Sequence, residues 1–441
     1  MLKFHLVTDT HYYNYEKHGF SNHLDQVTVN ESGAIIDAIF DKLLADASTD
    51  LVLIAGDLVT GGDRVSHEAF LQKLRRLQLG GKRVFVITAS HDYKCEAYGG
   101  VPRNAEHICR AELFDFYYEF GFRQAIARYA PDPLSYVAQL APGYRVLCLN
   151  GDLHRQEADD GHYLWAAEQI AKAKAEGQMM FGMHHYPVLP PSPIYPILAP
   201  NDGLHADVAA FLANAGLRFV FTGHTHMQNI ARMATPEGGL LYDINTGAAV
   251  GCGAPFRTVV IDDETMRVTT ETIHDFDWDL RGKSVKQYLD DNFDKMLRSI
   301  FEAADKDVEE MLDILDSEFR VNKAALLKFK PLLVLFGKFL YRLTFGGAAR
   351  LLCCKIPPEM RHVRVKDFIM EAVRSIYAGD EPYSRTTPQG AAAWAITGRL
   401  DALAKPLLKK ADLPFENLQS FVASLLYDSG LPDNNAVLPL K

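Results

Sequence analysis

Five short clusters of side chains that bind hard metal ions recur along the first 226 residues. They are Asp9-Thr10-His11, Gly56-Asp57, Ser90-His91-Asp92, His184-His185 and Gly223-His224-Thr225-His226. Carboxylate oxygens and imidazole nitrogens suit Mn, Fe, Zn or Co, and soft thiolate ligands are missing from the clusters. Together the clusters predict a site for two divalent metal ions, which would activate water for a hydrolytic reaction.

The clusters differ in how specifically they indicate metal binding. Residues i and i+2 of an extended segment point to the same side, so Asp9 and His11 can reach one ion. Alone, however, an Asp-x-His or a Gly-Asp sequence is more often only a turn. Two imidazoles at i and i+2, as in His224 and His226, favour metal binding. The prediction of a metal site therefore rests on the occurrence of all five clusters in this order.

Each cluster follows an apolar, β-branched run, which predicts that a strand delivers it to the edge of a sheet. These runs are residues 4–7, 51–54, 84–87, 179–181 and 219–221. Helical spacing between them predicts helices over 31–47 and 67–78, and short strands at 239–244, 257–261 and 266–273 favour a second, mixed sheet facing the first. The expected fold class is α/β, a four-layer αββα sandwich of two mixed sheets flanked by helices.

The chain of 441 residues exceeds the usual size of one domain, so a second domain is expected. The composition shifts around 279–283, and Ser284 to Gln287 has the pattern of a helix capping box. Helical patterns follow near 322–344, 358–377, 389–411 and 415–427. We therefore expect a first domain over 1–280 and an all-α C-terminal domain over 281–441.

Charge and composition exclude several classes of partner. The formal net charge of -10 argues against bulk binding to nucleic acid or an anionic membrane. The most apolar stretch is 326–345. It contains Lys and Arg residues and a proline, so we expect a buried helix, with an interfacial or partner-binding helix as the alternatives.

We expect a cytoplasmic protein. The six cysteines include no CxxC pair, and the chain starts almost directly in a strand.

The order of the clusters resembles the calcineurin-like metallophosphoesterase superfamily over about residues 1–275. The motifs of that superfamily are D-x-H, G-D, G-N-H-[DE], a histidine often followed by x-P, and G-H-x-H. The resemblance implies that one ion is held by Asp9, His11, Asp57 and His226, with Asp57 bridging to a second ion. That second ion would take His224 and one histidine of the 184–185 pair. The H-x-P spacing points to His185, with His184 as the alternative.

The third motif of the pattern departs from the family. Its G-N-H-[DE] motif reads Ala89-Ser90-His91-Asp92 here, so Ser90 replaces an asparagine ligand of the second ion. A serine hydroxyl is a poorer ligand than an amide oxygen, so we expect the second ion to be held weakly or through water. By the resemblance, His91 would stabilise the transition state or protonate the leaving group, and Asp92 would orient its imidazole.

The resemblance implies hydrolysis of a small phosphoester by attack of a metal-bridging hydroxide. A phosphoesterase domain followed by a helical domain is similar to bacterial cyclic-nucleotide phosphodiesterases, so phosphodiesters are the first expectation. A phosphomonoesterase with the same metals and a non-catalytic scaffold that binds a partner through the helical domain are the alternatives. Specificity is expected to come from the loops 12–29 and 187–205. An oligomer or a partner bound through the helical domain also stays open.

Overall fold

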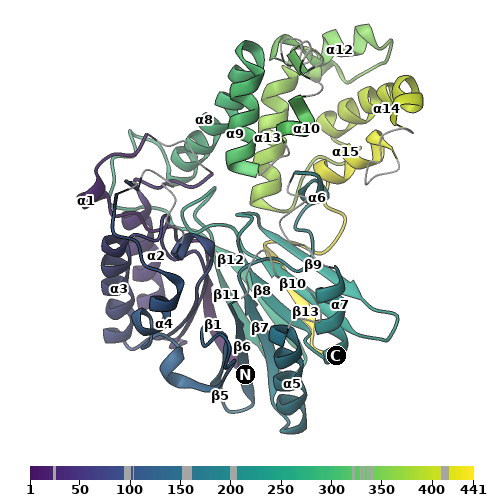
Figure 1. Cartoon of the computed structure of the whole chain (residues 1–441). Helices are drawn as coiled ribbons and strands as arrows, with labels where there is room; N and C mark the ends of the chain where they lie inside the picture. The colour runs from purple at the N-terminus through teal and green to yellow at the C-terminus, as the bar shows by residue number, and fades with distance from the viewer. Residues whose placement is uncertain are drawn as a thin grey trace. The chain divides into compact units, whose positions relative to one another are not determined.

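The computed structural model describes residues 1–22, 26–93, 101–102, 104–150, 161–198, 206–319, 323–327, 330, 333–334, 337, 341–408 and 417–441. The chain forms two compact units (Figure 1). The first, here called the sandwich unit, consists of Met1–Pro191, Asp202–Phe293 and Asp433–Lys441. The second, the helical unit, consists of Ser192–Asn201 and Asp294–Pro432.

The first sheet of the sandwich unit holds three of the strands that precede ligand clusters. In spatial order its strands are β13 (Asn435–Pro439), β12 (Thr265–Glu271), β11 (Phe256–Ile261), β1 (Leu2–Val7), β2 (Leu51–Ala55) and β3 (Arg83–Ile87). β1, β2 and β3 are parallel neighbours, whereas β11, β12 and β13 pair antiparallel. The carboxyl ends of β1 to β3 therefore meet at one edge of the sheet.

The second sheet holds the other two ligand-bearing strands. Its order is β4 (Ala125–Arg128), β5 (Tyr136–Ala141), β6 (Tyr144–Leu149), β7 (Met179–His184), β8 (Phe219–Thr222), β10 (Leu240–Asn245) and β9 (Asn229–Ala234). β6, β7, β8 and β10 are parallel, and the outer pairs are antiparallel. Both sheets are thus mixed, as predicted.

Aromatic side chains join the inner faces of the two sheets. The ring of Phe4 on β1 stacks on Phe181 of β7 with centroids 5.2 Å apart and meets Phe221 of β8 edge-on at 5.4 Å. All three side chains are fully buried. The three strands are buried along almost their whole length, which explains why continuous apolar runs form them.

Helices cover the outer faces. α2 (Ser32–Ala45) and α3 (Arg64–Leu79) flank the first sheet, and α5 (Gly161–Ala175) and α7 (Ala206–Ala215) flank the second (Figure 1). In the second pair, Tyr163 and Leu212 pack in one core with Leu147 and Val220 of the sheet. The expected four-layer αββα sandwich is confirmed.

The structure also contains shorter helices and 3-10 turns. The helices are α1 (Tyr15–His18), α4 (Leu113–Phe116) and α6 (Tyr195–Leu198), and the 3-10 turns are Ser90–Asp92, Arg110–Glu112, Phe122–Gln124 and Pro358–Met360.

The sheet assignment of two strands differs from the prediction. The segments expected at 257–261 and 266–273 form β11 and β12, but they join the first sheet beside β1 instead of the second. β11 runs antiparallel along β1, with Phe4 opposite Val259 and Leu6 opposite Arg257. Alternating hydrophobicity predicts that a segment is a strand, but it does not say which neighbour the strand pairs with.

The C-terminal region is helical, as predicted. Its helices are α8 (Val285–Lys306), α9 (Val308–Phe319), α10 (Lys323–Leu327), α12 (Phe345–Leu351), α13 (Val365–Ala378), α14 (Pro388–Leu408) and α15 (Leu418–Leu426). The capping box at the start of α8 is present, since the Gln287 amide donates to Ser284 Oγ and the Ser284 amide to Gln287 Oε1. Phe345, Phe368 and Leu426 pack in the core of the helical unit.

The last part of the chain was expected to be helical but forms a strand of the sandwich unit. β13 pairs antiparallel with β12, with Leu438 opposite Met266. Leu438 is fully buried, whereas Val437 beside it is half exposed, so the side chains alternate as in other half-buried strands. A division into two domains must therefore assign Asp433–Lys441 to the sandwich unit.

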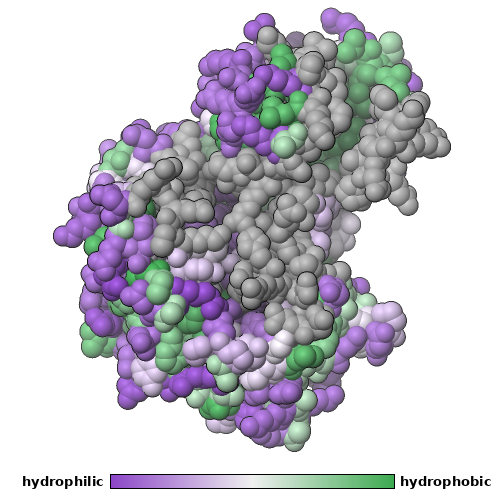
Figure 2. All heavy atoms as spheres, viewed as in Figure 1, coloured by the Kyte–Doolittle hydropathy of each residue, from purple (hydrophilic) through white to green (hydrophobic). Residues whose placement is uncertain are grey.

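The length and composition of the helices and the hydropathy of the surface relate to the expected absence of a membrane span. Among the described residues we find no helix that has both the length and the apolar composition to cross a bilayer. Much of the apolar stretch 326–345 lies outside those residues. On the viewed face of the sandwich unit, hydrophilic residues cover much of the described surface, with hydrophobic residues scattered among them (Figure 2). Single exposed apolar side chains of this kind need no special role.

Candidate metal centre

The carboxyl ends of five strands from both sheets bring the sequence clusters together. Asp9 and His11 follow β1, Asp57 follows β2, and Ser90–Asp92 forms a 3-10 turn after β3. His185 follows β7, and His224 and His226 follow β8. Parallel strands present their carboxyl ends at one edge, so residues far apart in sequence reach one place in the sandwich unit.

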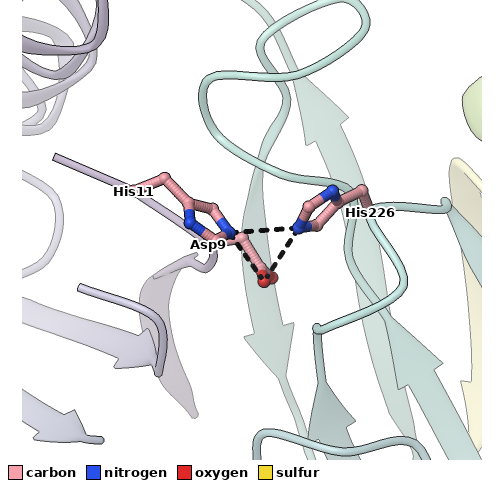
Figure 3. Close-up of side chains that lie close together, drawn as sticks. All are labelled: Asp9, His11 and His226. Carbon is pink, nitrogen blue, oxygen red and sulfur yellow. Dashed lines mark hydrogen bonds and ion pairs between the residues drawn. The ribbon is translucent and has the colours of Figure 1, made fainter. Parts of the chain in front are cut away.

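The first group consists of Asp9, His11 and His226 (Figure 3). The Nε2 atoms of the two histidines lie 3.1 Å apart, and Asp9 Oδ1 is 3.7 Å from His11 Nε2 and 3.4 Å from His226 Nε2. Asp9 and His11 are buried, and the His226 side chain is 10% exposed. Two imidazole nitrogens and a carboxylate oxygen that face one point are the arrangement of a metal site.

Asp57 belongs to two further groups, one with His185 and His224 and one with His11 and His91. Its Oδ2 lies 2.9 Å from His185 Nε2, 3.9 Å from His11 Nε2 and 4.0 Å from His91 Nε2. The carboxylate is fully buried. Asp57 therefore lies between the first group and the His185 and His224 pair, where a carboxylate shared by two ions would have to lie.

Backbone carbonyls fix the orientation of two of the imidazoles. His185 Nδ1 donates to the carbonyl of Ala55 at 2.8 Å, and His91 Nδ1 donates to the carbonyl of Thr60 at 3.1 Å. In both rings this leaves Nε2 directed toward Asp57. An outer hydrogen bond of this kind is usual for histidines that bind metal, because it sets the tautomer and the ring angle.

His184, the alternative to His185, points elsewhere. Its Nδ1 donates to the Tyr186 carbonyl at 2.5 Å, and the Tyr163 hydroxyl lies 3.4 Å from its Nε2. It joins none of the metal-ligand groups found among the described residues. Burial lowers the pKa of His184 to about 3, which keeps the ring neutral. Successive residues at a strand end point to opposite sides, so only one histidine of the pair can face Asp57.

The backbone is in a left-handed conformation at five of these residues. Asp9, His11, Asp57, His224 and His226 have φ between 36° and 69°. Such angles cost free energy in a residue other than glycine, and they persist only where surrounding contacts hold them. Hydrogen bonds within the centre do so, since the His224 amide donates to Asp9 and the His91 amide donates to Asp57 Oδ1.

Two glycines allow this close packing. A Cβ on Gly56, whose φ is +92°, would lie 2.6 Å from His185 Nδ1. A Cβ on Gly223 would lie 2.3 Å from Asp9 Oδ2 and 2.2 Å from Thr8 Oγ1. Any other residue would push a candidate ligand out of place. This steric requirement explains why glycine precedes Asp57 and His224 in the Gly-Asp and Gly-His-x-His clusters.

Charges within the cluster support the ionised carboxylates. Burial opposes ionisation of Asp57, but His185 and His91 hold the pKa of its carboxyl well below its usual value. The pKa of Asp9 is also lowered, against the effect of burial, by His185, His11 and His226. Burial lowers the pKa of His185, but the carboxylates of Asp57 and Asp9 raise it more, so the pKa rises to about 9. Without metal, protonated histidine takes the place of a cation beside these carboxylates.

Asp92 has a different neighbourhood from the one expected. Its Oδ1 accepts the amides of Leu58 and Val59, and its Oδ2 accepts the amide of Ala89. The described ring contact of His91 Nδ1 is to Thr60 instead. Burial and then the charge of Asp57 raise the pKa of Asp92 to about 7. The carboxyl thus ties the loop after β2 to the turn that carries His91.

Ser90 is 3% exposed, and its Oγ has no hydrogen-bond partner among the described residues. A buried hydroxyl without a protein partner is unusual, and it is able to bind an ion or a water molecule. This is compatible with a weak or water-mediated ligand.

Replacing Ser90 with asparagine is expected to tighten binding of the second ion by about tenfold or more, the scale of changes close to metal ligands. An amide oxygen supplies the ligand that the hydroxyl supplies poorly. Calorimetric titration with Mn²⁺ measures both binding steps, and the first step acts as an internal reference. Ser90→Ala serves as the matched control and should not tighten the second step. Two ions retained by the wild type after dialysis against a chelator would contradict the expectation.

Several residues around the centre were missed by the sequence analysis. The carbonyls of Ala55 and Thr60 orient two histidines, but any residue type could supply a carbonyl. Asn245, the last residue of β10, donates to the Gly223 carbonyl and accepts from the Thr225 hydroxyl. A polar residue at a strand end is the signal that could have indicated Asn245.

The donor set fits two divalent ions. Buried carboxylates and imidazoles converge on a shared Asp57, with Nε2 atoms facing inward, and no cysteine belongs to the groups found among the described residues. Nitrogen and oxygen donors of this kind suit Mn, Fe, Zn or Co.

The chain is similar to solved phosphatase structures and matches a family model. A search of curated proteins finds no match. A dimetal phosphatase from Danio rerio is similar in structure, with 15% identity over 62% of this chain and 96% of that chain and a TM-score of 0.46. A purple acid phosphatase from yellow lupin (Lupinus luteus) seeds is similar with 11% identity over 61% of this chain and 51% of that chain and a TM-score of 0.44.

The family model for calcineurin-like phosphoesterases matches residues 2–228, just over half of the chain. The matched segment contains all five ligand clusters, from Asp9 to His226. The chain therefore belongs to the calcineurin-like phosphoesterase family, with the dimetal phosphoesterase fold and its candidate metal-binding residues.

Proposed function

We propose that this protein is a hydrolase of phosphodiesters that uses two divalent metal ions. The proposal depends on the position of the Asp57 carboxylate, which belongs both to a group with His11 and His91 and to a group with His185 and His224. One ion would be held by Asp9, His11, Asp57 and His226. The other would be held by Asp57, His185 and His224, with Ser90 as a weak or water-mediated ligand.

The two ions would supply an activated water nucleophile and neutralise charge on the phosphate. The residues of the chain then have three tasks. Asp57 would be a ligand shared by both ions, and the carbonyls of Ala55 and Thr60 keep His185 and His91 pointed inward. His91 is the proposed proton donor to the leaving oxygen. Its side chain is 17% exposed, more than that of His226 at 10%, so substrate can reach it from solvent.

Charge around the centre supports a diester over a monoester. Every ion pair that Asp9 and Asp57 make with described residues is to a histidine. No Lys or Arg of the described chain shares these carboxylates to add fixed positive charge. A diester carries a single negative charge and needs less neutralisation than the dianion of a monoester. The layout with a C-terminal helical region, similar to that of bacterial cyclic-nucleotide phosphodiesterases, also supports a diester.

The test compares two chromogenic substrates and a cyclic nucleotide in the presence of Mn²⁺. We expect kcat/KM for bis-p-nitrophenyl phosphate to exceed that for p-nitrophenyl phosphate by about tenfold or more, and turnover of cyclic AMP, because a mismatch of one charge costs on the order of one kcal/mol or more. Chelator should remove the activity and Mn²⁺ restore it. Faster hydrolysis of the monoester would favour a phosphomonoesterase, and no hydrolysis of any ester would favour the scaffold.

A further inference from the structure

A fully buried arginine lies beside the loop that carries His224 and His226. Arg257, on β11, has no exposed surface. Its guanidinium donates to Thr246 Oγ1 at 3.0 Å, to the Asn245 carbonyl at 2.7 Å and to Gln228 Oε1 at 2.6 Å. A charged group this deep in a protein is costly to desolvate, so several hydrogen bonds are needed to hold it.

Two of these partners hold the loop 223–226 from either end. Asn245 donates to the Gly223 carbonyl at 2.8 Å and accepts from the Thr225 hydroxyl at 2.8 Å. Gln228 is the second residue after His226, and its Oε1 accepts both from Arg257 and from the Gly247 amide. Asn245 and Gln228 are both almost completely buried. The guanidinium thus connects the two polar residues that border the loop.

The C-terminal segment contributes a third contact. Arg257 Nη1 donates to the carbonyl of Asp433 at 2.8 Å. Asp433 Oδ1 in turn accepts the Ile230 amide at 2.8 Å, just beyond Gln228. Asp433 is 1% exposed and lies two residues before β13, the last strand of the first sheet. The end of the chain and the loop after β8 therefore meet at one side chain.

We propose that Arg257 is a positioning residue for the metal centre, holding the loop of His224 and His226 through Gln228, Asn245 and Asp433. Both histidines have a positive φ, of 69° and 59°, which the loop would relax without such contacts. A shift of about 1 Å in a ligand is enough to weaken a metal site. The inference rests on the proposed function, since it takes His224 and His226 as ligands.

The test measures Mn²⁺ binding to the full chain by calorimetry, at a temperature well below the Tm of each variant. Arg257→Met should weaken Mn²⁺ binding by about 10- to 100-fold, as loss of outer contacts to metal ligands does. Arg257→Lys keeps the charge but not the planar fork, and should lie between Met and wild type. Asp433→Ala, a milder change, should weaken binding in the same direction, whereas Asp433→Asn keeps an acceptor for Ile230 and should bind nearly as the wild type.

The matched control is Lys82→Met. Lys82 is 5% exposed and donates to the carbonyls of Asp46 and Thr49, at the opposite end of the parallel strands from the ligands. Its loss should lower the Tm and leave Mn²⁺ affinity unchanged. Equal Mn²⁺ affinities in Arg257→Met and Lys82→Met would overturn the positioning role of Arg257, and equal affinities in Asp433→Ala and Lys82→Met would remove Asp433 from it. A wild type that binds no Mn²⁺ would instead overturn the proposed function, so the two failures are distinguishable.

Discussion

Replacing Asp57 with asparagine should reduce Mn²⁺-dependent hydrolysis by on the order of a hundred- to a thousandfold, the effect of removing a key electrostatic group from an active site. The carboxylate is buried and is grouped with four imidazoles, with Oδ2 at 2.9 Å from His185 Nε2. Asparagine has nearly the same shape, but it removes the negative charge and places an NH₂ group toward at least one imidazole or cation. We expect the number of Mn²⁺ ions bound per chain to fall along with kcat/KM.

Asp50→Asn is the matched control for this prediction. Asp50 precedes β2 as Asp57 follows it, and it pairs with Arg83 on the exposed side of the sandwich unit. An exposed ion pair contributes little, so Asp50→Asn should keep wild-type activity and metal content. Unchanged turnover in Asp57→Asn would contradict the shared-carboxylate centre.

Replacing His91 with alanine should lower kcat by about 100-fold or more while Mn²⁺ binding changes little, because a proton donor contributes that much to a hydrolytic step. The His91 ring is held by the Thr60 carbonyl and faces Asp57 from the exposed side of the centre. The loss should be larger for a diester with an alkyl leaving group than for bis-p-nitrophenyl phosphate. Nitrophenolate leaves without protonation, whereas an alkoxide needs the proton.

The comparison of the two leaving groups separates a proton donor from a merely structural histidine. A structural role predicts the same loss for both esters and a lower Tm. His274→Ala, a change of an exposed histidine, controls for the loss of an imidazole elsewhere. A His91→Ala variant that loses Mn²⁺ in parallel with activity would show that His91 acts as a ligand, as its group with His11 and Asp57 also allows.

Local patterns predicted the strands and clusters because their causes are local. A run such as 51–54 is apolar on both sides because β2 is buried on both faces, and the ligands follow where the strand ends. Helical spacing placed α2 and α3, and the capping box at Ser284 marked the start of α8. Each of these features depends on residues within a few positions of one another.

Choices between similar residues needed the tertiary structure. The sequence leaves His184 and His185 as neighbours of the same type, and only the position of Tyr163 and Asp57 separates them. Asp92 follows His91 directly, yet its carboxylate accepts amides from the loop after β2, because that loop lies over the turn. Residues 257–261 were predicted as a strand and the last residues as part of the all-α domain, but the pairing of β11 with β1 and of β13 with β12 depends on the whole sheet.

The sequence by itself determined the chemistry of this protein: the donor atoms, their order along the chain and the strands that carry them. The tertiary structure decided which donors meet, and it added the parts with no local signal, such as the Thr60 carbonyl behind His91 and the buried Arg257 beside the His226 loop. The physical reason is the distance along the sequence over which the interactions act. Strand propensity and turn formation depend on neighbours in sequence, whereas a metal centre depends on strand ends from two sheets meeting in space.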